Sequence, residues 1–144
     1  MSQLILSGYT PYPQLPHDSR LPHIARKLTD QIHKTALDAE HLVPFSYTDT
    51  LDLDLFKRDG YRIVGLEQDE RSVMITDYRT PDKTVLILGE EVEGISSELL
   101  RQCDDIIEIP MKGHKESFNV SVSAGIALYA LLQGGANPSQ SISK

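Results

Sequence analysis

The stretch EIPMKGHKESFNVSVSAGIALYALL, residues 108–132, contains the features that decide the fold. A strand-like run ends at Pro110, a polar loop follows, and a helix rich in small residues opens on Ser117, Phe118 and Asn119. The simplest interpretation is a helix that Ser117 caps, with exposed lysines in the loop before it. The alternative is a binding site, because lysine, histidine, glutamate, serine and asparagine crowd into one turn between two apolar elements.

Length and composition indicate one globular, cytoplasmic domain. The chain has 144 residues, of which 40% are hydrophobic and 24% charged, enough to bury a core. Its single cysteine, Cys103, excludes a disulfide framework and fits a reducing compartment. The longest apolar stretch is far shorter than a membrane span, and the first residues do not resemble a signal peptide. We expect one domain over residues 1–133 and a disordered tail over 134–144.

The charge distribution restricts the function. A net charge of −7 argues against a sequence-blind nucleic-acid coat, which needs clustered lysine and arginine. Basic residues nevertheless gather in residues 17–34 and again at Lys112, His114 and Lys115. These segments are either a local phosphate-facing surface or ordinary solvated faces. The five histidines and the cysteine show no metal-ligand spacing, so we expect no metal.

Strand and helix patterns alternate along the chain. Apolar runs predict strands over 3–7, 45–48, 61–67, 84–89 and 105–110. Helical spacing and caps predict helices over 24–42, 51–60, 96–103 and 117–133, the second capped by Asp49 or Thr50. We therefore expect an α/β fold with a mostly parallel sheet flanked by helices.

Two polar loops follow predicted strands, GEEVEG at 89–94 and MKGHKES at 111–117. Ligands of parallel sheets bind where such loops converge, at the carboxyl ends of the strands. Taken alone, the first loop is more simply an ordinary turn with solvated carboxylates. A hydrolase built from Ser117 and His114 is disfavoured, because no nucleophile elbow surrounds the serine.

Together, LILGEEVEGIS and IPMKGHKESFNVSVSAGIALY resemble the second and third motifs of the SpoU/TrmH family of RNA 2′-O-ribose methyltransferases, in the SPOUT class. Phe118 replaces the usual leucine. LSGYTPYPQ, HKTALDAE and IVGLEQ look like a subgroup of that family, except that Asp38 stands where that subgroup would have glycine. The resemblance reaches to about Gln133.

The resemblance implies a C-terminal trefoil knot, a pocket for S-adenosylmethionine, an RNA substrate (tRNA or rRNA) and a homodimer formed through the final helix. Glu91, Ser117 and Asn119 match the polar catalytic positions of the family. The positions implied to contact the cofactor are Leu88, Gly89, Ile109, Met111, Phe118 and Asn119.

One part of the family pattern has no counterpart here. The first family motif carries an asparagine and then an arginine on a strand and helix that precede Leu4. Arg20 and Arg26 do not match that arginine. We therefore expect an N-terminally truncated domain that lacks the first strand–helix unit. The alternative to an active methyltransferase is a catalytically inactive dimeric relative that binds cofactor or RNA.

Overall fold

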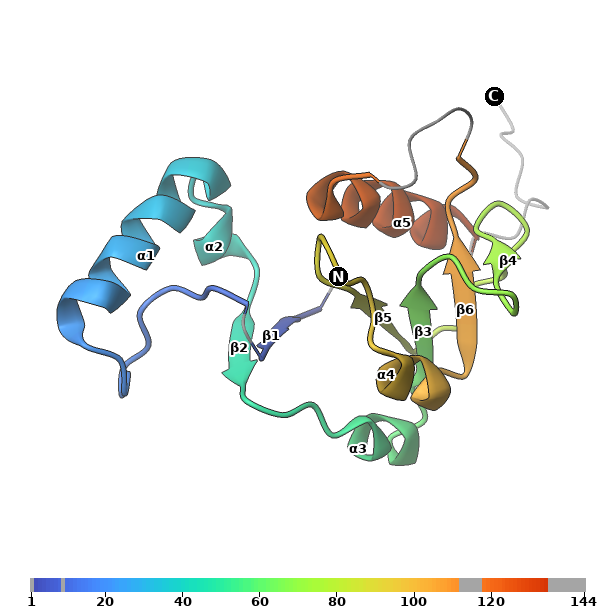
Figure 1. Cartoon of the computed structure of the whole chain (residues 1–144), viewed down its shortest axis with the longest axis horizontal. Helices are drawn as coiled ribbons and strands as arrows, with labels where there is room; N and C mark the ends of the chain where they lie inside the picture. Colours follow the sequence, from blue (N-terminus) through green and yellow to red (C-terminus); the bar gives the residue numbers. More distant parts are fainter. Residues whose placement is uncertain (1, 9, 112–117, 135–144) are drawn as a thin grey trace, which may run out of the picture. The chain divides into compact units, whose positions relative to one another are not determined.

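A computed structural model describes residues 2–8, 10–111 and 118–134 (Figure 1). The chain divides into two compact units, one reaching to Leu51 and the other beginning at Asp52. The single domain expected over residues 1–133 stays a prediction. The expected disordered tail also stays one, since residues 135–144 lie outside the described residues.

The first unit contains a small parallel sheet and two helices. Strand β1 (Leu4–Ser7) pairs in parallel with β2 (Phe45–Thr48), with Leu4 opposite Phe45. Helices α1 (Pro22–Ala36) and α2 (Ala39–Leu42) lie between them in the chain. The apolar run at 3–7, whose composition favours a buried strand, does form strand β1, but this strand is not buried: Leu4 is exposed and the rest of β1 is half-buried.

The continuous helix predicted over residues 24–42 is also wrong, because the backbone breaks at Leu37 and Asp38. Both residues have a left-handed conformation, with φ of 50° and 70°. The Leu37 N–H donates to the carbonyl of His33 and closes α1, and the Leu37 side chain is exposed rather than part of an apolar stripe. Aspartate tolerates this conformation better than most residues, and glycine adopts it without cost. The break therefore explains why glycine is expected at position 38.

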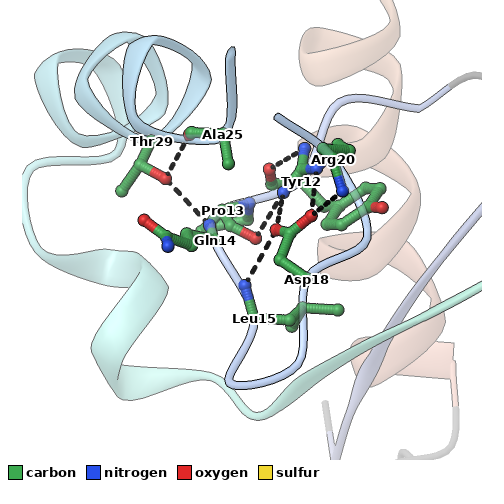
Figure 2. Close-up of polar contacts among 8 residues, drawn as sticks. All are labelled: Tyr12, Pro13, Gln14, Leu15, Asp18, Arg20, Ala25 and Thr29. Atoms are coloured by element: carbon green, nitrogen blue, oxygen red, sulfur yellow. Dashed lines mark hydrogen bonds and ion pairs between the residues drawn. The ribbon is translucent and has the colours of Figure 1, made fainter. Parts of the chain in front are cut away.

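Arg20 holds the proline-rich loop between β1 and α1 (Figure 2). Its guanidinium donates to Asp18 Oδ1 at 2.8 Å and to the carbonyls of Tyr12 and Pro13 at 3.0 and 3.2 Å. It also lies 3.6 Å from the centroid of the Tyr12 ring, which in turn stacks on Tyr47 of β2. The hydrogen bond from Arg20 holds the pKa of the Asp18 carboxyl well below its ordinary value. One arginine thus organises the loop.

The second unit contains a four-stranded parallel sheet in the order β4-β6-β3-β5. Its elements are α3 (Leu53–Arg58), β3 (Arg62–Leu66), β4 (Val73–Met74), β5 (Thr84–Leu88), α4 (Ser97–Gln102), β6 (Asp105–Glu108) and α5 (Val120–Gly134). The predicted parallel sheet and helices are confirmed, although the two-residue strand β4 gave no pattern in the sequence. Within the described ranges, no helix is long and apolar enough to cross a membrane.

Helices cover both faces of this sheet. One face forms a core with α5, made of Val64, Ile75, Ile107, Ala127 and Leu131. On the other face Gly65 leaves room for α4, since a Cβ there would lie 3.1 Å from Cys103 Sγ and 3.5 Å from Leu100 Cδ2. Burial raises the pKa of the Cys103 thiol, which donates to the Leu99 carbonyl. Cys103 is therefore a packing residue in this fold.

Polar groups at the strand and helix starts fix the register. Arg62 at the start of β3 makes two hydrogen bonds to Asp105 at the start of β6, at 2.8 and 3.0 Å, and Tyr78 donates to the same carboxylate at 2.8 Å. These bonds lower the pKa of Asp105. Ser96, the first residue of the helix predicted over 96–103, caps α4 by accepting from the N–H of Leu99. Helix α3 is different, because its cap is Asp52 rather than Asp49 or Thr50.

Candidate functional site

A cavity of about 360 Å³ lies at the carboxyl edge of the four-stranded sheet. The arrowheads of β3 and β6 point to this edge (Figure 1). Its walls come from the residues that follow β3, β5 and β6 and from the start of α5. The volume is within the range of roughly 300–1,000 Å³ that is typical of ligand pockets. The segments after β5 and β6, which the sequence placed at strand ends, therefore converge on one cavity.

Most of the predicted site residues line this cavity. They are Leu88, Gly89, Glu91, Ile109, Met111 and Phe118. Leu88 ends β5, and Ile109 and Met111 follow β6, so parallel pairing brings these side chains to one edge. Phe118 joins them from the segment before α5. The aliphatic, thioether and aromatic side chains form an apolar wall suited to a flat ring system.

The loop between β5 and α4 closes on itself. Glu90 and Gly94 exchange two backbone hydrogen bonds, of 3.1 and 3.0 Å. Gly89 permits this closure, because a Cβ on it would lie 2.2 Å from the carbonyl carbon of Gly94. Gly94 itself has a φ of +68°, a conformation that favours glycine. The glycines therefore shape this loop and present Glu91 and the exposed Val92 at its tip.

Glu67 supports the loop between β5 and α4, although the sequence analysis assigned this residue no role. Its Oε2 accepts a hydrogen bond of 2.9 Å from the N–H of Ile95, and its Oε1 accepts one of 3.0 Å from Gln68. A Cβ on Gly94 would lie 2.3 Å from Glu67 Oε2, so the carboxylate fills the space under that glycine. Its place directly after β3 was the available signal, since ligands bind beyond the strand ends.

Asn119 holds a structural position at the start of α5. Its Oδ1 accepts from the backbone N–H of Ser121 at 2.9 Å and from the Ser121 hydroxyl at 2.8 Å. This is the geometry of a helix cap, and α5 begins at Val120 rather than at Ser117 as predicted. Asn119 is exposed and is not among the residues that line the cavity. Ser117 lies outside the described residues.

The described rim of the cavity is acidic. It carries the carboxylates of Glu67, Glu90, Glu91, Glu93 and Glu108, and no lysine or arginine is among its described lining residues. Opposite charges attract more strongly near a protein surface than in bulk water. This rim therefore favours a ligand with positively charged groups beside an apolar ring.

The fold and cavity define a class of protein: a parallel α/β sheet with helices on both faces and a ligand-sized pocket at its carboxyl edge. The model of the SpoU rRNA Methylase family matches residues 20–129. The chain belongs to this family.

Relatives and solved structures agree with this assignment. The tRNA (guanosine(18)-2'-O)-methyltransferase of Borreliella burgdorferi is 35% identical over 80 residues, which are 56% of this chain and 37% of that protein. The A. aeolicus TrmH/SpoU tRNA modifying enzyme has a TM-score of 0.64 at 26% identity, covering 92% of this chain and 61% of that one. The AdoMet-bound rRNA methyltransferase from Sinorhizobium meliloti has a TM-score of 0.71 at 20% identity, covering 94% and 47%, which shows the shared fold. The matched region thus spans only part of each of these three proteins.

Proposed function

We propose that this chain carries the S-adenosylmethionine-binding domain of an RNA methyltransferase that modifies a ribose 2′-hydroxyl of tRNA or rRNA. The observation that carries the proposal is the single cavity at the carboxyl edge of the sheet, which both family motifs line. The names of the similar tRNA and rRNA methyltransferases, one of them bound to AdoMet, support the reaction class and the cofactor.

The described residues fit this cofactor. Leu88, Ile109, Met111 and Phe118 offer an apolar wall for the adenine ring. Gly89 also lines the cavity and, having no side chain, offers a ligand only backbone groups. The acidic rim suits the positive charges of the sulfonium and amino groups. When bound, S-adenosylmethionine supplies an electrophilic methyl group for transfer to an oxygen nucleophile.

The chain's own contribution is to position the reacting groups. Because the cap at α5 fixes Oδ1 of Asn119, the orientation of its amide is set before a ligand binds. Glu91, Ser117 and Asn119, the polar positions that the resemblance to the family implies, would hold the ribose and the cofactor in line, and positioning of this kind supplies a large part of many rate enhancements. None of these three positions is assigned the activation of the hydroxyl.

We further propose that two copies associate through α5. Val122, Tyr129 and Leu132 on this helix expose large apolar side chains, with 71% of Tyr129 accessible. A second copy of the same helix would remove this surface from water, and apolar burial drives association. The predicted trefoil knot depends on the path of residues 112–117, which lie outside the described residues, and it stays a prediction.

Calorimetric titration of S-adenosylmethionine, and of its demethylated product, into the full chain tests the cofactor assignment. We expect saturable binding with one site per chain, weakened at least tenfold by Gly89→Ala, whose methyl would collide with the loop. Leu55→Ala is the control, because Leu55 is exposed on α3 and does not line the cavity. Absence of binding by the folded protein would refute the proposal.

A second assay distinguishes an active methyltransferase from a catalytically inactive relative. Labelled S-adenosylmethionine is incubated with the chain and bulk tRNA or rRNA, and the digested RNA is analysed for 2′-O-methyl ribose. Product formation supports the methyltransferase. Cofactor binding without product favours a catalytically inactive dimeric relative that holds cofactor or RNA.

A further inference from the structure

Four metal-ligating side chains meet at the corner between α1 and α2, in the first unit and apart from the cavity described above. They are His33, Asp38, Glu40 and His41. Each offers one ligand atom, and these atoms all lie within 4.8 Å of one another. His33 Nδ1 is 2.6 Å from Glu40 Oε1 and 3.7 Å from Asp38 Oδ1, and His41 Nε2 is 3.8 Å from the same Glu40 oxygen.

Glu40 is the centre of this cluster and is unusual in its burial. Its side chain is only 10% exposed, whereas those of His33, Asp38 and His41 are 56%, 75% and 73% exposed. Its Oε2 is buried and has no hydrogen-bond partner within the described part of the chain. Buried carboxylate oxygens are normally paired, because leaving one without a partner is unfavourable. This oxygen is therefore able to accept a further partner, such as a cation.

We propose that this cluster, the α1–α2 corner site, binds one divalent zinc ion through His33, Asp38, Glu40 and His41. Two imidazole nitrogens and two carboxylate oxygens are a ligand set that zinc accepts, with bonds of about 2.0–2.2 Å. Ligands at that distance from one ion lie roughly 3–4 Å apart. Two of the observed separations, 3.7 and 3.8 Å, agree with this, and the 2.6 Å contact between His33 and Glu40 must lengthen. All the ligand atoms lie within 4.8 Å of one another, so small side-chain movements bring them to one ion.

The left-handed break in the backbone creates the site. If residues 33–41 formed one continuous helix, His33 and His41 would be separated by eight residues, a rise of about 12 Å. After the break at Leu37 and Asp38 their ring centroids are 6.4 Å apart. Zinc bound here would clip the end of α1 to α2. This inference departs from the expectation of no metal drawn from linear spacing, and it does not rest on the proposed methyltransferase function.

The test is a titration of zinc chloride into the full chain after removal of metal by chelation and dialysis. We expect one zinc per chain by calorimetry and by elemental analysis of the dialysed complex. The double variant His33→Ala/His41→Ala should lose more affinity than the roughly 10–100-fold that removal of an outer-shell partner costs. Its matched control, His17→Ala/His23→Ala, removes two histidines outside the cluster and should bind as the unchanged chain does.

Two further measurements keep the outcome decisive. Asp38→Asn retains a side chain that tolerates the left-handed backbone but is a weaker ligand, so it should weaken zinc binding while circular dichroism stays unchanged. X-ray absorption should show nitrogen and oxygen neighbours only, which excludes Cys103 as a ligand. Absence of saturable binding, equal affinity in the double variant and its control, or a sulfur neighbour would each overturn the proposal.

Discussion

Replacing Gly89 with alanine tests how the loop after β5 is held together. An alanine Cβ would lie 2.2 Å from the carbonyl carbon of Gly94 and 2.4 Å from the backbone nitrogen of Ile95. Carbon atoms in favourable contact are about 3.5–4.0 Å apart, so the opposite backbone must retreat by more than roughly 1 Å. This movement separates the two backbone hydrogen bonds between Glu90 and Gly94 and the bond from Ile95 to Glu67.

The cost follows from these bonds. Each neutral backbone bond contributes about 0.5–1.5 kcal/mol, and a bond to a charged acceptor contributes about 1.5–3 kcal/mol. Because the loop can open locally, we expect the free energy of unfolding to fall by about 2–4 kcal/mol, less than the largest sum of these terms. Urea denaturation followed by circular dichroism measures it, since the chain has no tryptophan. Hydrogen exchange at the amides of Gly94 and Ile95 reports the loop itself.

Gly125→Ala is the control for this experiment. Gly125 lies within α5, where an added Cβ meets nothing within 4 Å, so we expect a gain of roughly 0.5–1 kcal/mol. A Gly89→Ala variant as stable as the unchanged chain, with unchanged exchange at Gly94 and Ile95, would show that the close approach does not hold the loop.

Three further changes test the fold. Ile107→Ala removes a fully buried side chain from the core and should lower the free energy of unfolding by roughly 2–5 kcal/mol in urea denaturation. Asp105→Asn should cost about 1–2 kcal/mol at neutral pH, because it weakens the partly exposed pair with Arg62. Arg62 lowers the pKa of Asp105 in the folded protein. The stabilisation is therefore complete above the unfolded pKa of about 3.9 and is lost as pH falls through the folded pKa. The stability of Asp105→Asn should change less with pH in this range, and a pH dependence equal to that of the unchanged chain would contradict the assignment. Arg20→Lys cannot keep both the carboxylate fork and the stack on Tyr12, so hydrogen exchange of the proline-rich loop should become about tenfold faster; unchanged exchange would show that Arg20 does not hold the loop.

Local patterns were sufficient for much of the fold. The apolar run predicted as a strand over 84–89 forms β5, and the helix predicted to begin at Ser96 is α4, which starts one residue later. The two polar loops could be placed at one edge because parallel strands carry their carboxyl ends to the same side. The position of each strand in the sheet, by contrast, depends on which strands pair with it. Strand β5 lies at the edge of its sheet, and the two residues of β4 pair only because β6 runs beside them.

The candidate site divides in the same way. The motifs around Gly89 and Phe118 were visible in the sequence, because glycine spacing and a run of apolar and polar residues are local properties. The role of Glu67 was not visible in the sequence. Its partners Gly94 and Ile95 are far along the chain and meet it only when β3 and β5 pair. The position of Glu67 directly after β3 indicates only that it lies at the edge where ligands bind, and not that its carboxylate supports a loop.

The sequence by itself determined most of the strands and helices, the polar segments at the strand ends and the family motifs, since each depends on residues close together in the chain. Only the tertiary structure decided which strands are neighbours, that one cavity unites the two motifs, and that His33 and His41 approach each other. Strand neighbours and the cavity depend on pairing between residues far apart in the chain. His33 and His41 meet because two residues with left-handed φ, Leu37 and Asp38, break an apparently continuous helix. Periodicity of side chains does not record the backbone angle at a single position, and at this corner that angle decides which ligands meet.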